Sequence, residues 1–303
     1  MGNNAIKTIF AAIGAALCLF ACSGAEVVEN TTACVQVRTD SKSDVPQDGM
    51  SLMLFNSEGR LVSGGRFDSE AGLRARTGTG YTLVALSHCP DFLSGLPPTL
   101  DEVLSSRLDL AEWNDPGEEL FASRAVRQIP VLGPEGVSVE LELVRFASRA
   151  VLREVALADG CGMGEVTLSR VFLSGAGLSR TIGGGTVSSG GGTSAEAPAC
   201  ADIGILLREG SALAPDISLF CYPTDSLSLV LELVWDGNKY YYHADLSSLR
   251  ENCSCDVSLT VKNPGSTDPE RPLGRDELSV GATLSEWAFG KEFNTNLSNQ
   301  SKL

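Results

Sequence analysis

The chain contains two histidines, His88 and His243, and they limit the nucleophilic chemistry that it could perform. A hydrolytic triad needs a base beside its nucleophile, and a serine nucleophile often lies in a Gly-x-Ser-x-Gly turn. No such turn accompanies either histidine. His88 stands before Cys89-Pro90 at the end of an apolar run, a position that is typical of a strand exit. We therefore expect no nucleophilic catalysis.

Two pairs of adjacent acids, Asp101/Glu102 and Glu118/Glu119, could in principle act as glycosidase carboxylates. Adjacent acids more commonly lie on a solvated helix end or in a loop, and no aromatic platform for a sugar surrounds either pair. The glycine-rich residues 183–193 lack the Lys-Ser or Lys-Thr ending of a phosphate-binding loop. Because no strong catalytic constellation is present, the sequence predicts that the protein is not an enzyme.

The cysteines in the body of the chain are odd in number. They are Cys34, Cys89, Cys161, Cys200, Cys221, Cys253 and Cys255. If they form disulfides, at least one thiol stays free or pairs between molecules, and the pairings stay open. Cys253 and Cys255 would face the same side of a strand, and with His243 they could begin a zinc site. Since no second cysteine pair has ligand spacing, we expect buried cysteines or a disulfide, with neither a metal nor a cofactor.

The N-terminal residues carry the clearest signal for a covalent modification. Lys7 precedes an apolar run at 9–20, and a small residue, Ala21, then stands directly before Cys22. A basic start, a short apolar stretch and a small residue at the cleavage point are typical of a secretory signal. The run is too short to span a bilayer, which takes roughly 20 residues. The pattern resembles a bacterial lipobox, in which Cys22 would be acylated and become the new N-terminus.

Two other cleavage points are available in the same region. Cys18 fits less well because the bulky Leu17 precedes it, and an ordinary secretory signal cut at Ala25 is the alternative. We predict a lipoprotein signal peptide at 1–21, lipidation at Cys22 and a polar tether at 22–33. The expected location is the outer membrane, with the protein lipid-anchored and exposed at the cell surface.

The balance of charges excludes some partners. Removal of residues 1–21 takes away Lys7 and no acid, so the net charge of −15 becomes about −16. Nucleic-acid binding needs basic patches that displace phosphate counterions, so we expect no nucleic-acid partner. The acidity also opposes docking on anionic lipid through the protein itself. Membrane attachment would therefore depend on the acyl chains.

Alternation of apolar and polar residues recurs along the chain and predicts strands. It is clearest at 137–143, where valines and leucines alternate with serine and glutamates. Further strands are predicted at 35–38, 51–55, 61–62, 81–86, 151–157, 165–173, 217–222, 227–233, 240–242, 257–261 and 278–284. Many short strands without a βαβ rhythm favour antiparallel sandwiches, so we expect an all-β fold.

One segment at 97–113 has a helical pattern. Thr99 followed by Glu102 forms a capping box, and apolar residues at 100, 103, 104 and 108 form one stripe. We predict a single short helix inserted in the first domain. The low-complexity residues 183–193 are a linker or a mobile loop, and we favour the linker. The predicted domains are therefore an N-terminal β-sandwich at 34–182 and a C-terminal β-sandwich at 194–303.

Several segments carry a family resemblance when they are taken in order. They are the lipobox at Cys22 and the segments at 80–85, 139–150, 221–224, 257–269 and 278–287. Together they resemble the fimbrillin-like fimbrial subunits of Gram-negative anaerobes, which are lipoproteins that build or anchor short adhesive fimbriae. The order and spacing of the segments match across most of the mature chain.

The resemblance implies two transthyretin-like β-sandwich domains, no enzymatic activity and polymers made by strand addition between fimbrial subunits. In this family, shaft subunits lose their first strand by cleavage after an arginine. The residues at 23–34 contain no arginine here, and Arg38 and Arg60 are the first to occur. This departure favours an uncleaved anchor of the FimB type. Its interaction surface would include a strand edge at 257–261 or 278–284.

A surface lipoprotein that binds glycans or proteins for nutrient uptake is the alternative. Such glycan binders usually present clustered aromatic platforms. Here Trp113, Trp235 and Trp287 lie in separate segments, and the residues at 240–242 are three tyrosines that alternate between two faces. Either Tyr241 faces outward and its two neighbours inward, or the reverse. The anchor, shaft or tip position, the adhesion ligand on host or bacterium, and any further proteolytic maturation stay open.

Overall fold

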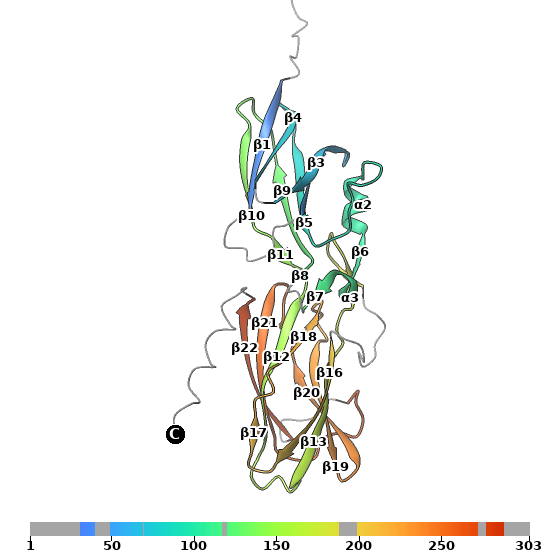
Figure 1. Cartoon of the computed structure of the whole chain (residues 1–303), viewed down its shortest axis with the longest axis vertical. Coiled ribbons are helices and arrows are strands. Elements are labelled where there is room, and N and C mark those ends of the chain that lie inside the picture. Colours follow the sequence, from blue (N-terminus) through green and yellow to red (C-terminus); the bar gives the residue numbers. More distant parts are fainter. Residues whose placement is uncertain are drawn as a thin grey trace, which may run out of the picture.

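A computed structural model of the protein describes residues 31–39, 49–68, 70–116, 120–187, 199–271 and 277–287. Strands dominate these residues, which confirms the predicted all-β class. They form two β-sandwiches stacked end to end, which we call the N-terminal and C-terminal sandwich (Figure 1). The signal peptide, Cys22 and most of the predicted tether lie outside the described residues. Within them, no helix is long and apolar enough to cross a membrane.

The N-terminal sandwich places a three-stranded sheet against a five-stranded sheet. The smaller sheet has the order β10 (Val137–Leu141), β1 (Thr32–Thr39), β4 (Glu70–Arg76). The larger sheet has the order β11 (Val144–Arg145), β9 (Ser123–Ile129), β5 (Tyr81–Ser87), β2 (Met50–Asn56), β3 (Leu61–Phe67). The central strand β1 pairs in parallel with β10 and antiparallel with β4. Its inward residues Val35 and Val37 are buried in the core between the two sheets.

The C-terminal sandwich is built from two further sheets. One, which we call the β22 sheet, has the order β17 (Ala212–Leu213), β12 (Ser148–Leu157), β21 (Cys253–Val261), β22 (Leu278–Glu286), and β18 (Ile217–Cys221) also pairs with β12. The other has the order β16 (Cys200–Arg208), β13 (Glu165–Ser174), β19 (Ser228–Trp235), β20 (Asn238–Asp245). The core between them includes Leu229 and Leu231, whereas Leu141 and Leu143 lie in the N-terminal core.

The point at which the chain passes between the sandwiches differs from the predicted linker at 183–193. β12 pairs with β21, and β13 pairs with β16 and β19, so residues 148–174 belong to the C-terminal sandwich. The cores divide between Leu143 and Ala150. Assigning 148–174 to the N-terminal sandwich was therefore wrong. Alternation identifies a strand but does not say which distant strand it pairs with, and the glycine-rich composition was the misleading cue.

The glycine-rich segment instead begins in a hairpin. β14 (Ser179–Thr181) pairs with β15 (Thr186–Val187) and with β6 (Arg107–Asp109) of the N-terminal half. Gly184 and Gly185 have φ values of 119° and 91°, which side chains disfavour, so the turn uses them for their backbone freedom. Residues 188–193 lie outside the described part of the chain. The hairpin thus returns the chain to the N-terminal sandwich before it re-enters the C-terminal one.

The predicted helix is present but is divided in two. α2 (Leu100–Ser105) begins at the predicted capping box, in which the Thr99 side chain accepts a hydrogen bond from the Glu102 backbone N–H. α3 (Leu110–Trp113) follows, and β6 separates the two helices. The prediction of one helix was wrong because the chain at 107–109 leaves helical geometry to pair with β14. A two-stranded pair, β7 (Asn114–Asp115) with β8 (Leu120–Phe121), completes this insertion.

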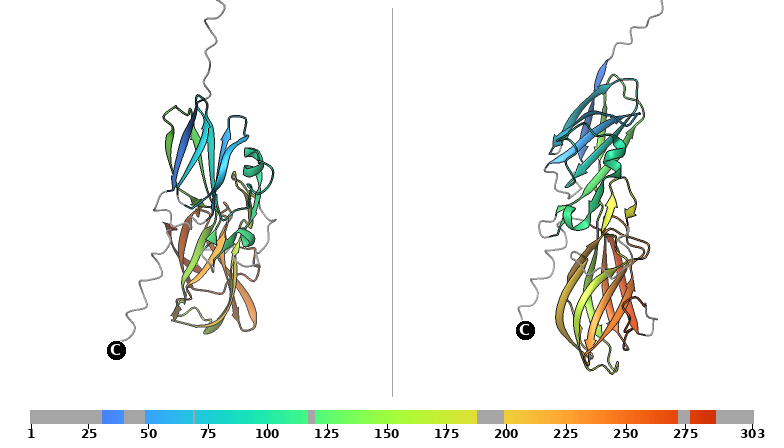
Figure 2. Two further views of the ribbon diagram at one scale, coloured as in Figure 1. Left: turned by 45° about the horizontal axis from the view of Figure 1, so that its top comes forward. Right: turned by 90° about the vertical axis from the view of Figure 1, so that its right-hand side faces the viewer.

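A third buried cluster, which we call the joint, lies between the two sandwiches. Figure 2 shows the region of the backbone where the two sandwiches meet. The joint contains Phe121 and Phe146 from the N-terminal half and Phe220, Tyr222 and Trp287 from the C-terminal half. Buried arginines lie among these rings. Arg180 stacks over the Phe146 ring at 4.5 Å, and its Nη1 pairs with the Glu251 carboxylate at 2.6 Å. Because apolar and charged groups from both halves are buried together, the joint ties the two sandwiches to one another.

Candidate strand-addition interface

The structure does not assemble the candidate catalytic residues. His88 lies in the N-terminal sandwich, edge-on to Trp113 with ring centroids 6.3 Å apart, and burial lowers its pKa although Asp115 raises it. His243 lies on β20 in the other sandwich, where burial also lowers its pKa. Of the acid pairs, Glu102 is used in the α2 cap, and Glu118/Glu119 lie outside the described residues. The two histidines therefore do not share a site.

The seven cysteines of the folded part are all free thiols in the structure. Cys253 and Cys255 lie on the same face of β21, as expected, and pack in the C-terminal core without bonding to each other. Among the described residues, no group of three or more histidines, cysteines and acids has the geometry to hold a metal ion. Burial raises the pKa of Cys89 and of Cys221 to about 12.

Thiol reactivity should follow this burial. The thiolate is the reactive form, and a raised pKa lowers the fraction of thiolate at neutral pH. We expect iodoacetamide, followed by peptide mass spectrometry, to label the half-exposed Cys34 of the native protein long before Cys221. Unfolding in denaturant should remove the difference. Equal labelling rates in the native protein would contradict this placement of Cys221.

The edge strand β22 is the site that best matches an interaction surface. Its register with β21 pairs Val280 with Leu259, Ala282 with Val257 and Leu284 with Cys255. Opposite residues in an antiparallel pair point to the same face. The β21 residues belong to the C-terminal core, so the apolar β22 residues also lie on the core face of the sheet. The other face carries Ser279, Gly281, Thr283 and Ser285.

Described residues leave most of the apolar face of β22 uncovered. Leu278 is buried in the core, but Val280 and Leu284 are 44% and 48% exposed, and the strand is exposed on both faces from residue 281 to its end. Its second edge has no strand partner among the described residues. An exposed apolar strand with free backbone N–H and C=O groups is a template for pairing with another chain. This supports the predicted surface at 278–284.

The other predicted surface, at 257–261, is not an edge. β21 pairs with β12 on one side and with β22 on the other, so both of its backbone edges are occupied. The sequence could not distinguish the two strands because both show the same alternation. Alternation of apolar and polar residues indicates which face of the sheet each residue occupies. Whether the strand lies at the centre or at the edge of the sheet depends on its pairing with strands far along the chain.

Other long edge strands in the described part of the chain carry charges that β22 lacks. These include Arg66 on β3, Glu70, Arg74 and Arg76 on β4, Asp202 and Arg208 on β16, and Lys239 on β20. β16 also contains a bulge where its register shifts, and Gly204 there has a φ of 72°. Charges and bulges at an edge oppose pairing with another chain. β22 has no charged residue before Glu286, its last.

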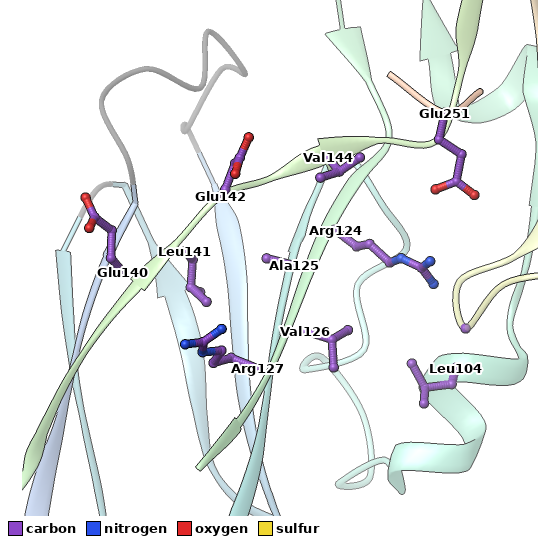
Figure 3. Close-up of a pocket in the computed structure, with 11 residues that line it drawn as sticks. Leu104, Arg124, Ala125, Val126, Arg127, Glu140, Leu141, Glu142, Val144 and Glu251 are labelled. Atoms are coloured by element: carbon purple, nitrogen blue, oxygen red, sulfur yellow. The ribbon is translucent and has the colours of Figure 1, made fainter. Parts of the chain in front are cut away.

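An opening between β9 and β10 is lined by charged residues, unlike the β22 edge. It forms a cleft of about 640 Å³ on the side where the two sheets of the N-terminal sandwich separate (Figure 3). Arg127 reaches from β9 toward Leu141, and Glu140 and Glu142 stand on the β10 side. An inward-pointing charge is a recognised protection of a sheet edge. We conclude that this opening is guarded, whereas the β22 edge is not.

Trp287 fixes the end of β22 in the joint. Its ring lies edge-on to Phe121 at a centroid distance of 4.6 Å and beside Phe220 at 5.6 Å. Arg145 and Arg149 place their guanidinium groups 5.0 and 5.3 Å from the ring centroid. Arg145 Nη1 also donates a hydrogen bond of 2.7 Å to the Trp287 carbonyl oxygen. The strand is thus held at this end while its middle stays exposed.

The aromatic residues in the described part of the chain do not present the platform that the glycan-binding alternative requires. Trp287 is buried, and Trp235 meets Tyr240 at an interplanar angle of 47°. Tyr242 lies in the C-terminal core, and Tyr241 is buried on the opposite face of its sheet. This decides between the two orientations left open for the tyrosines. The described aromatic pairs are tilted or edge-on to each other, so they offer no flat stacking surface.

Comparison with known proteins identifies similar folds. No model of a protein family and no curated protein match the chain. A candidate cell adhesion protein from Parabacteroides distasonis is similar in structure, with a TM-score of 0.60, 14% identity and coverage of 86% of this chain and 98% of that one. A fimbrilin from Porphyromonas gingivalis has a TM-score of 0.58 at 12% identity, covering 86% of this chain and 98% of its own.

A third solved structure is the tip fimbrial protein Mfa3 of Porphyromonas gingivalis, with a C-terminal truncation. It has a TM-score of 0.51 at 9% identity and covers 85% of this chain and 99% of its own. Similarity at such low identity establishes the fold and no more. The likeness extends over nearly the whole of each solved chain and over both sandwiches of this protein.

Proposed function

We propose that the protein is a cell-surface fimbrial subunit without enzymatic activity, lipid-anchored in the outer membrane through Cys22. The observation that carries the proposal is the unguarded β22 edge, an exposed apolar strand next to a firmly held end. Adding a strand to such an edge supplies main-chain hydrogen bonds and alternating side-chain contacts. The fold that the chain shares with a fimbrilin and a tip fimbrial protein supports the fimbrial role.

Within fimbriae, the position that we propose is the membrane anchor or an assembly-limiting subunit. The family resemblance implies that shaft subunits lose their first strand after an arginine, and residues 23–34 contain none. Arg38 lies within β1, which is paired with both β10 and β4. Removing β1 would expose the core that Val35 and Val37 fill. An intact β1 leaves the N-terminal lipid covalently joined to the folded protein.

Replacing the chromosomal gene by a Cys22→Ala variant tests the proposal. We expect the protein to leave the membrane fraction, and fimbriae to move from the cell surface into the medium, because a single lipid-bearing residue joins them to the membrane. Cell-bound and shed fimbriae would be measured by immunoblotting and electron microscopy. Cys34→Ala, which changes a half-buried cysteine inside β1, is the matched control and should leave both fractions unchanged.

Two results would count against the proposal. Fimbriae that stay attached to cells carrying the Cys22→Ala variant would exclude the anchor role. Unchanged surface fimbriae in a complete deletion strain, together with tight binding of an oligosaccharide by the purified protein, would replace it with the nutrient-binding alternative.

A further inference from the structure

We propose that the β22 edge pairs with β22 of a second copy of this chain, antiparallel and around a two-fold axis at Ala282. This rests on the proposed function and names a second copy of this chain, in place of another fimbrial subunit, as the strand that the β22 edge receives. In this pairing, the β22 sheets of the two copies join into one continuous sheet. The sequence of β22, Leu278–Glu286, favours a second copy as the partner. When the strand is aligned antiparallel with itself, exposed apolar residues lie opposite exposed apolar residues and serine lies opposite serine.

The complementarity can be followed residue by residue from Ala282 outward. A two-fold axis perpendicular to the sheet places Val280 opposite Leu284 of the partner subunit, and Ser279 opposite Ser285 of the partner subunit. The apolar residues all lie on the core face, so each exposed apolar side chain meets another apolar side chain. Directly opposite side chains in an antiparallel pair have Cβ atoms about 4.5–5.5 Å apart and interact favourably.

Exposure selects this register over its neighbours. Val280 and Leu284 are the two large exposed side chains of the strand, and the axis at Ala282 brings them together twice, once on each side. Moving the axis to Gly281 would place the exposed Leu284 opposite Leu278, which already lies in the core. Moving it to Thr283 would place Val280 opposite the charged Glu286. Of the three registers, the one with its axis at Ala282 therefore covers the largest exposed apolar surface.

Charge does not oppose the pairing. The strand has no charged residue between Leu278 and Ser285, so no like charges meet across the edge. In the proposed register, Glu286 lies opposite Leu278 of the partner subunit, which keeps the two glutamates at opposite ends of the ladder. The other exposed apolar edge pair, Ile205 and Leu206 on β16, lies between Asp202 and Arg208 and next to the bulge. These charges and the bulge thus oppose the pairing of β16 with β16 of a second copy.

Sedimentation of the mature chain carrying Cys22→Ala tests the pairing. We expect a monomer–dimer equilibrium that shifts toward dimer as the concentration rises. The double variant Val280→Lys/Leu284→Lys should be monomeric throughout, since four ammonium groups would meet across the edge. Ile205→Lys/Leu206→Lys is the matched control, because its side chains are 38% and 49% exposed against 44% and 48%. The control should dimerise like the parent chain.

Cysteine cross-linking tests the register. Ala282→Cys lies on the axis and should give an oxidised dimer that exceeds the background of the parent thiols. Val280→Cys alone should not, because the two new thiols would be about four residues apart along the ladder, or roughly 13 Å. Mixing Val280→Cys with Leu284→Cys should restore the cross-link. A monomer at every concentration, or cross-linking of Val280→Cys as efficient as that of Ala282→Cys, would overturn the proposal.

These outcomes are separable from failure of the proposed function. If the purified chain is monomeric but fimbriae are shed from the Cys22→Ala strain, the anchor stands and the second copy is excluded as the partner. If the chain dimerises but fimbriae stay attached to that strain, the dimer stands and the anchor role falls.

Discussion

Replacing Trp287 with alanine is expected to lower the free energy of unfolding by about 3–5 kcal/mol, the usual cost of truncating a large buried aromatic side chain. Trp287 is 7% exposed and fills the joint between Phe121 and Phe220. The variant would leave a cavity and would also remove the ring over which Arg145 and Arg149 stack. Chemical denaturation followed by circular dichroism would measure the loss.

The matched control for this substitution is Trp235→Ala. Trp235 is half-buried at the end of β19 and contacts Tyr240 at a centroid distance of 5.8 Å. Because solvent already reaches it, its truncation should cost less than that of Trp287. Equal losses for the two variants would show that Trp287 does not hold the joint. Since Trp287 contacts both halves of the molecule, its loss should also let the two sandwiches unfold in separate steps.

The Val37→Asp substitution should be at least as damaging, with an expected loss of about 4 kcal/mol or more. Val37 is 1% exposed, so the new carboxylate would lie among the apolar side chains of the N-terminal core. Its strand, β1, is also the only strand partner of β10 within the described residues. Disruption of β1 should therefore release β10 as well, and the smaller sheet would be lost.

Gln36→Asp is the control within the same strand. Gln36 is exposed, and this substitution adds the same negative charge one residue away from Val37. We expect a change within about 0.5 kcal/mol, as for other surface substitutions. Hydrogen exchange would show the difference directly, with protection lost in β1, β4 and β10 of Val37→Asp alone. A Val37→Asp protein as stable as Gln36→Asp would contradict the central position of β1.

Local features of this protein could be predicted from its sequence, and pairings could not. The capping box at Thr99 and the strand around Tyr81 depend on neighbouring residues, and both are present. The assignment of β12 and β13 was wrong because their partners lie far along the chain. Alternation indicates a face, but the free energy of a non-local pair depends on both strands.

The same reasoning explains the partial success with the interaction surface. The segment 278–284 was predicted together with 257–261, since both alternate cleanly. Only the sheet order shows that β22 is at an edge and β21 is not. The absence of charge from β22 was readable in the sequence, and the charges on β3, β4 and β16 were readable too. Their meaning depended on knowing which strands have an unoccupied edge.

The central place of β1 has a mechanical consequence. β1 begins at the end of the N-terminal sandwich that faces away from the C-terminal one, and β22 lies in the C-terminal sandwich (Figure 1). A pull on the start of β1 against a strand bound at β22 would therefore run along the molecule's long axis. β1 lies close to that direction and is held on both sides, by β10 and by β4. Such a load shears both ladders at once, so their hydrogen bonds resist together rather than opening one by one. In the proposed role as an anchor, this arrangement of β1 would let the N-terminal sandwich resist a pulling force that unzips strands one hydrogen bond at a time.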